Sequence, residues 1–100
     1  MNEICKLAVD TYGKESQINQ AFEEMGELIV AINHWRRGRA TKEDVLSEIA
    51  DVAIMCEQLC YIIHGTDDGI WECKNIVKQK LLRQEERIKN HIASANTQKS

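Results

Sequence analysis

The sequence predicts an all-α protein, an antiparallel bundle of about four helices. Proline is absent and Glu, Lys, Gln, Ala, Leu and Ile are frequent, which favours helix throughout the chain. Apolar residues recur at alternating steps of four and three, and glycines separate the periodic segments. A chain of 100 residues is the size of one domain but buries only a modest core by itself. We therefore expect further copies to complete the bundle, as a homodimer or homotetramer.

The first two predicted helices are separated by Gly13. Residues 2–11 have apolar residues at helical spacing and should form a short helix that ends near this glycine. The second helix is expected to begin with Ser16 as its N-cap and to end near Arg37. The apolar positions of the first helix are Ile4, Leu7 and Ala8. Those of the second helix, which should face the core, are Ile18, Phe22, Met25, Ile29 and Ile32.

The third helix should begin after the N-cap Thr41, with Asp44 in the position of the acidic residue of a capping box. Its apolar stripe consists of Val45, Ile49, Val52, Cys56, Leu59 and Ile63. The last helix is predicted over about residues 68–93. Its stripe consists of Ile70, Cys73, Val77, Leu81 and Ile88. The sequence thus predicts one helical domain, residues 1–93, followed by a polar and frayed tail, residues 94–100.

Two acid-x-x-acid pairs interrupt the apolar patterns of the second and third helices. They are Glu24/Glu27 and Glu48/Asp51, and the segments around them match at an offset of 24 residues. At about 100° per residue, both pairs lie at the same edge of their apolar stripes. Because the loop between the two helices is short, the helices should pack antiparallel. Both acidic edges can then border one cleft.

The four carboxylates would repel one another unless a cation lay between them. Oxygen ligands, without His or Cys in the motif, point to magnesium or manganese rather than zinc. Calcium is the alternative, although these ligands lie on helices rather than on a loop of the EF-hand kind. A single acidic pair on a helix is usually only a solvated face. Two pairs at one phase on consecutive helices are much rarer by chance. The sequence therefore predicts a divalent-cation site.

Two segments, residues 17–28 and 47–55, resemble the MazG-like family of all-α nucleoside triphosphate pyrophosphohydrolases, especially its compact phage and bacterial forms. The likeness extends over about residues 12–90, and the family pattern is Glu-x-x-Glu, a spacer, then Glu-x-x-Asp. The pattern corresponds to Glu24, Glu27, Glu48 and Asp51. The resemblance implies that these acids bind magnesium. It also implies hydrolysis of a nucleoside or deoxynucleoside triphosphate between the α and β phosphates, which gives a monophosphate and pyrophosphate.

The last helix carries the cations that the resemblance assigns to the triphosphate. A Lys-Leu-x-Arg stretch in similar compact members corresponds to Lys80 and Arg83, and Arg87 follows one turn later. From Lys74 onward seven basic residues stand against two acids, a net charge of +5, which leaves −8 for the first 73 residues. A basic solvated face explains the same residues. Lys74 and Lys78 are rival candidates for the phosphate contact.

Two further roles follow for side chains near the acids. Glu27 is the candidate to accept the proton of the attacking water. Gln20 is a candidate to hydrogen-bond the substrate, and other side chains that could stack on the base or hydrogen-bond it are Tyr12, Gln17, Phe22, His34, Trp35 and Trp71. The sequence leaves the nucleobase and sugar open. The alternative function is a non-catalytic helical module that binds a nucleotide or a metal ion and acts in regulation or interaction.

The remaining features of the sequence concern the cysteines, the expected location of the protein and nucleic acid as a partner. None of its four cysteines forms a Cys-x-x-Cys pair, so we expect reduced thiols, with Cys56 and Cys60 facing the core; zinc shared with His64 is the alternative. No apolar run is long enough to span a bilayer, and Met1 does not lead into a signal sequence, so a cytoplasmic location is expected. The net charge of −3 argues against nucleic acid as a partner.

Overall fold

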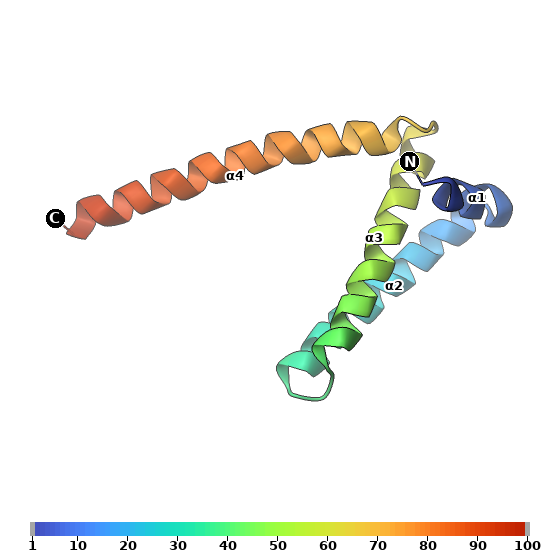
Figure 1. Ribbon diagram of the computed structural model, residues 1–100, viewed down its shortest axis with the longest axis horizontal. Helices are drawn as coiled ribbons and strands as arrows, with labels where there is room; N and C mark the ends of the chain where they lie inside the picture. The colour runs from blue at the N-terminus through green and yellow to red at the C-terminus, as the bar shows by residue number, and fades with distance from the viewer. Residues whose placement is uncertain (1, 100) are drawn as a thin grey trace. The chain divides into compact units, whose positions relative to one another are not determined.

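The computed structural model describes residues 2–99, with side chains as far as residue 97 (Figure 1). These residues form four α-helices and no strand, which confirms the all-α prediction. The helices are α1 (Glu3–Tyr12), α2 (Lys14–Arg36), α3 (Lys42–His64) and α4 (Gly69–Lys99). The chain divides into two compact units, Met1–Ile70 and Trp71–Ser100.

A single glycine joins α1 to α2. Gly13 has a φ of 93°, a conformation that favours glycine, and its N–H donates to the carbonyl of Val9 at 2.8 Å. Helix α2 begins at the next residue, Lys14, without a side-chain cap. The prediction that Ser16 caps this helix is therefore wrong. The backbone geometry of the glycine ends one helix and starts the next without an intervening turn.

Helices α2 and α3 run side by side in opposite directions, and α1 packs against both of them (Figure 1). The start of α3 has the predicted capping box. Thr41 donates its backbone N–H to Asp44 Oδ2 at 2.9 Å, and Asp44 donates its own to Thr41 Oγ1 at 3.1 Å. This reciprocal pair satisfies two N–H groups that a helix start leaves without partners. The short loop and the cap together set the antiparallel hairpin.

The buried face of this unit differs from the predicted apolar stripes. Its buried side chains include Cys5, Val9, Gln17, Ala21, Met55 and Gln58. Predicted core residues lie on the surface instead, among them Phe22, which is 64% exposed, and Ile29, which is 62% exposed. On a helix, Gln17 lies about 100° and Ala21 about 60° from Ile18, both on the same side of the predicted stripe. The predicted stripe is therefore wrong as the contact between α2 and α3, because the helices meet along the neighbouring face of small and polar residues.

Two glutamines form a buried hydrogen bond between α2 and α3. Gln17 donates its Nε2 to Gln58 Oε1 at 2.7 Å, and both side chains are buried. A buried amide without a partner costs about 1–3 kcal/mol, so the paired arrangement is favoured over any slip of one helix along the other. The pair therefore fixes the register of the hairpin, and with it the positions of Glu24 and Glu27 relative to Glu48.

Polar contacts hold α1 against α3. Glu57 on α3 accepts a hydrogen bond from the backbone N–H of Asn2 at 2.9 Å and another from the thiol of Cys5 at 3.4 Å. The hydroxyl of Tyr61 donates to Asp10 Oδ1 at 2.9 Å. These bonds lie away from the acidic pairs. Helix α1 therefore covers the end of the hairpin opposite the α2–α3 loop, and its role in this unit is structural.

No disulfide joins the four cysteines, all of which lie in the part of the chain that the structure describes. Burial is the main cause that raises the pKa of the Cys5 thiol, and the hydrogen bond to Glu57 adds to it, so the group stays protonated at neutral pH. Cys60 and Cys73 are half-buried, whereas Cys56 is exposed. The expectation that Cys56 faces the core of this unit is therefore wrong, whereas Val52 and Leu59 of the same predicted stripe are half-buried.

Residues 71–99 of the second unit belong to the long helix α4. The helical backbone continues past Ala93 to Lys99, so the expected fraying after Ala93 is not seen over the described residues; Ser100 lies outside them. Apolar side chains remain exposed along the helix, among them Val77 at 49%, Leu81 at 59% and Ile88 at 51%. Exposed apolar residues at helical spacing are typical of a helix that packs against a further surface.

Candidate metal centre

Three of the four predicted metal ligands come together in the α2–α3 hairpin. Glu24 and Glu27 from α2 and Glu48 from α3 each place a carboxylate oxygen within 4.8 Å of the other two. Ligands of a small divalent cation lie about 2.1 Å from the ion, and hence about 3 Å from one another in octahedral geometry. Small side-chain rotations would therefore close the three carboxylates around one ion.

Two oxygens of this cluster are buried without a partner. Glu24 Oε2 and Glu48 Oε2 are both shielded from solvent and accept no hydrogen bond from the residues that the structure describes. Such an oxygen destabilises the fold, because it has lost its hydrogen bonds to water and has formed none within the protein. A cation between the two oxygens would remove that cost. The three carboxylates, without His or Cys among them, fit a hard cation.

Glu27 is the exposed member of the cluster. The charge of Glu24 is the largest cause that raises the pKa of the Glu27 carboxyl, followed by partial loss of hydration and then by the charge of Glu48. The direction of this shift reflects repulsion among the three acids. A carboxylate that takes up a proton more readily than usual also suits the role of proton acceptor that is predicted for Glu27.

Asp51 lies outside the group of three. It is half-buried on α3, three residues after Glu48, and no oxygen of its carboxylate belongs to the cluster. Residues at i and i+3 share one side of a helix, so Asp51 and Glu48 point from the same side of α3. Its role as a fourth ligand stays a prediction.

Gln20 contacts one of the carboxylates directly. Its Nε2 donates to Glu24 Oε1 at 2.8 Å, across one turn of α2. The sequence suggested that this amide hydrogen-bonds the substrate, and the structure instead gives it a partner within the acidic cluster. The spacing of Gln20 and Glu24, four residues apart, was the available signal, because side chains at i and i+4 meet on a helix.

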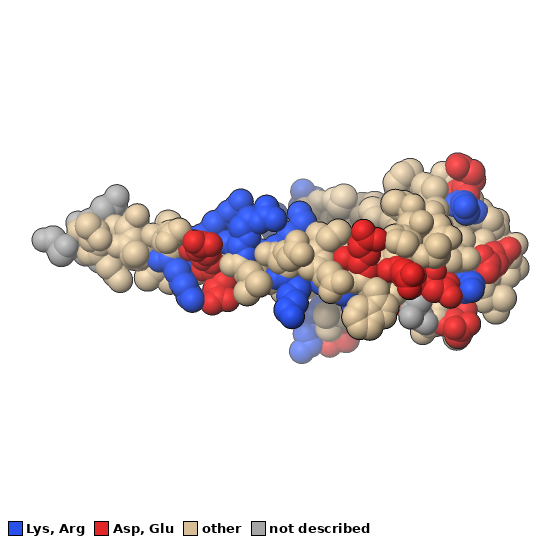
Figure 2. Space-filling view, turned by 90° about the horizontal axis from the view of Figure 1, so that it is seen from above, with Lys and Arg blue, Asp and Glu red and all other residues tan. Residues whose placement is uncertain are grey.

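The predicted phosphate-binding cations lie on α4, in the other unit. Lys80, Arg83 and Arg87 are exposed and line one shallow hollow together with Gln84. Figure 2 shows Lys and Arg side chains gathered along the middle of this helix. Spacings of three and four residues bring Lys80, Arg83 and Arg87 to one face of α4. Such a face attracts anions, and planar guanidinium groups suit phosphate oxygens in particular.

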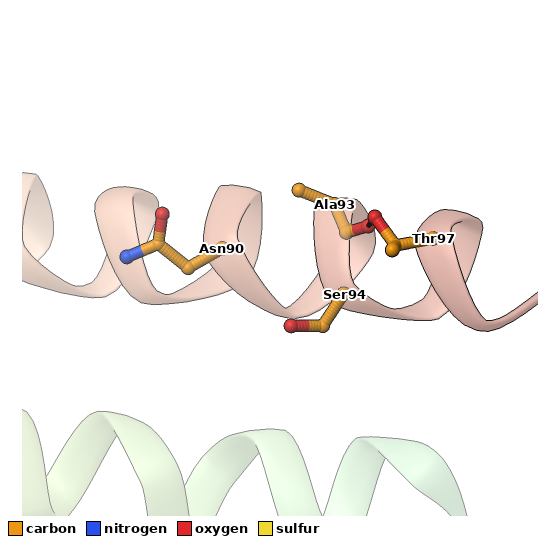
Figure 3. A pocket seen from close by; sticks show the side chains of 4 residues that line it. All are labelled: Asn90, Ala93, Ser94 and Thr97. Atoms are coloured by element: carbon orange, nitrogen blue, oxygen red, sulfur yellow. Dashed lines mark hydrogen bonds between the residues drawn. The ribbon is translucent and has the colours of Figure 1, made fainter.

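A second hollow on α4 has different chemistry. Asn90, Ala93, Ser94 and Thr97 line it, and their side chains are shown in Figure 3. All four are small and uncharged, and the hydroxyl of Thr97 donates to the carbonyl of Ala93 at 2.9 Å. This hollow therefore offers neither charge for a phosphate nor carboxylates for a metal ion.

The fold and the carboxylate cluster together define an all-α protein with a candidate divalent-cation site between two antiparallel helices. Comparison of the chain with protein-family models, with curated proteins and with solved structures found no match. None of the helices, over the part of the chain that the structure describes, is long and apolar enough to cross a membrane. The function is therefore argued from the chemistry of the cluster.

Proposed function

We propose that this protein is a magnesium-dependent hydrolase that converts nucleoside or deoxynucleoside triphosphates to the monophosphate and pyrophosphate, as the resemblance to the MazG-like family implies. The observation that carries the proposal is the pair of buried, partnerless oxygens on Glu24 and Glu48, in one cluster with Glu27. Manganese has the same ligand preferences and should replace magnesium.

Each side chain has a role in this proposal. Glu24, Glu27 and Glu48 would hold the cation, with Asp51 as a further ligand. A carboxylate oxygen of Glu27 that does not contact the ion would accept the proton of the attacking water. Bound magnesium would neutralise phosphate oxygens and lower the pKa of that water. A second set of residues, which are cationic, would contact the phosphate oxygens and neutralise part of the negative charge of the triphosphate. This set consists of Lys80, Arg83 and Arg87.

The activity is tested by incubating the purified protein with a panel of ribo- and deoxynucleoside triphosphates and magnesium. Monophosphate and pyrophosphate should appear together, in equal amounts, and EDTA should stop the reaction. Release of inorganic phosphate instead would place the cleavage at the wrong bond. No product across the panel, with retained binding of nucleotide or metal ion, would favour the non-catalytic module.

We also propose that the protein works as a homodimer or homotetramer. The support is the apolar stripe of the hairpin, where Phe22, Ile29 and Ile49 are 64%, 62% and 45% exposed. Exposed apolar faces of this kind are typical of surfaces that other helices cover. Light scattering coupled to size-exclusion chromatography should give twice or four times the 11.5 kDa of one chain. A monomer at micromolar concentration would contradict this part of the proposal.

A further inference from the structure

The two oxygens of Glu24 have different surroundings. Oε1 accepts a hydrogen bond from Gln20 Nε2 at 2.8 Å, whereas Oε2 is buried and has no partner among the described residues. The side chains of Gln20 and Glu24 are both half-buried on α2. The amide therefore engages one oxygen of Glu24 and leaves the other without a partner, on a residue that forms a cluster with Glu27 and Glu48.

This hydrogen bond limits how Glu24 can bind a metal ion. A carboxylate that binds through both oxygens must place them at nearly equal distances from the ion. Oε1 of Glu24 would then have to share its lone pairs between the ion and the Gln20 amide, which holds this oxygen in place. Calcium often takes carboxylates in this two-oxygen mode, within a shell of six to eight oxygens at about 2.3–2.6 Å. Magnesium takes single oxygens in octahedral geometry at about 2.0–2.1 Å and keeps several waters. The arrangement of Gln20 and Glu24 suits the second ion.

We infer that Gln20 is a positioning residue that restricts Glu24 to a one-oxygen ligand and so makes the site select magnesium or manganese over calcium. The inference rests on the proposed metal site. It replaces a direct contact between Gln20 and the substrate with an action through Glu24. A hydrogen bond that served only to stabilise α2 would affect the unfolding temperature and leave the ratio of the ion affinities unchanged.

The test is metal binding by the full chain without nucleotide. The free Mn²⁺ signal in electron paramagnetic resonance gives the affinity for Mn²⁺, and competition with Mg²⁺ and with Ca²⁺ gives the selectivity. In Gln20→Ala we expect the Mn²⁺ affinity to fall about 10- to 100-fold, as is common when a residue that orients a metal ligand is removed. Ca²⁺ should lose less, because both Glu24 oxygens become free to bind it, and the preference for Mg²⁺ over Ca²⁺ should shrink.

Two further variants test whether the effect depends on the hydrogen bond from Gln20 to Glu24 rather than on the presence of an amide in α2. Gln20→Asn keeps the amide but shortens the side chain beyond reach of Glu24, and it should behave as Gln20→Ala does. Asn19→Ala removes the exposed amide next to Gln20 and should leave the Mn²⁺ affinity and the selectivity unchanged. Alanine is the best helix former, so neither alanine variant should disturb α2, which circular dichroism checks.

Different results overturn different statements. A wild-type chain that binds no Mn²⁺ overturns both this inference and the proposed metal site. If the wild type binds Mn²⁺ and Glu48→Gln weakens this binding, the metal site stands. If Gln20→Ala or Gln20→Asn then keeps the wild-type preference for Mg²⁺ over Ca²⁺, only the role of Gln20 is overturned. Loss of selectivity in both Gln20 variants, with Asn19→Ala unchanged, supports the inference.

Discussion

The carboxylates of the α2–α3 hairpin and the cations of α4 are brought together in different ways. Glu24 and Glu48 come from two helices, and each has a buried oxygen that only tertiary packing could shield from water. Lys80 and Arg83 come from one helix, are exposed, and share a face because of helical spacing alone. Substitutions in the hairpin should therefore change folding and ion binding together, whereas substitutions on α4 should act through charge.

The largest expected effect is that of Glu48→Gln. Loss of one ligand charge should lower magnesium-dependent turnover by more than about 100-fold. The same change removes a buried oxygen charge that has no partner, so the metal-free protein should unfold at a higher temperature. Reduced activity together with raised stability would show that the carboxylates are placed for binding rather than for folding.

The matched control for this variant is Glu43→Gln. Glu43 is an exposed acid in the first turn of the same helix, outside the cluster. Its substitution should leave turnover unchanged and lower stability only slightly, because an acid at a helix start is favourable. Full magnesium-dependent activity in Glu48→Gln would remove this residue from the metal site.

The second effect concerns the buried glutamine pair and tests the packing side of the comparison. Gln58→Leu leaves Gln17 buried without its 2.7 Å hydrogen bond, so the free energy of unfolding should fall by about 1–3 kcal/mol. The double change to leucine should recover much of this loss, because both polar groups are then absent. Urea denaturation of the single and double variants measures the coupling.

An exposed amide on α4 provides the contrast. Gln84→Leu should change the free energy of unfolding by less than about 0.5 kcal/mol, since the side chain lies on the surface. Equal losses in Gln58→Leu and Gln84→Leu would mean that the buried pair contributes nothing beyond helix propensity. The proposed distinction between the two regions would then fail.

Local signals in the sequence predicted the helices well. The capping box of Thr41 and Asp44 depends on residues three apart, and it is present as predicted. The acidic pairs were recognised from spacing as well, and three of their four residues converge. Each of these features needs only the geometry of one helix, or of two helices joined by a short loop.

The face along which the helices pack could not be predicted in the same way. The most apolar face of α2 begins at Ile18, yet the buried residues are Gln17 and Ala21. A small residue such as Ala21 lets two helices approach closely, and Gln17 is acceptable in the interior only because Gln58 stands opposite it. That partner is 41 residues away, so no local pattern indicates it.

The third effect tests the cation side of the comparison. Arg83→Ala should raise KM for the triphosphate about 10-fold, equivalent to about 1.4 kcal/mol, with a smaller change in kcat. Arg83→Lys should recover part of the loss, because the charge remains while the planar fork is absent. The difference should shrink at high salt, since exposed charges are screened.

Lys74→Ala is the control for charge alone. Lys74 is exposed on α4 but does not line the hollow formed by Lys80, Arg83 and Arg87. Its loss should change KM much less than the loss of Arg83. Equal effects of the two alanine variants would mean that the helix attracts nucleotide only through its overall charge.

The smallest effect comes from a local device within the hairpin, the capping box. The hydrogen bond from the backbone N–H of Thr41 is the main cause that lowers the pKa of Asp44 below its ordinary value of 3.8, and the Thr41 side chain adds to it. A carboxyl whose pKa is lowered by folding contributes stability above its unfolded pKa, and this contribution is lost as the pH falls through the lowered value. In Asp44→Asn the difference in unfolding temperature between pH 7 and pH 3 should therefore be smaller than in the wild type. The neighbouring Glu43→Gln should keep the wild-type difference, and a matching reduction there would show that general charge at the helix start, rather than the cap, governs the acid sensitivity of α3.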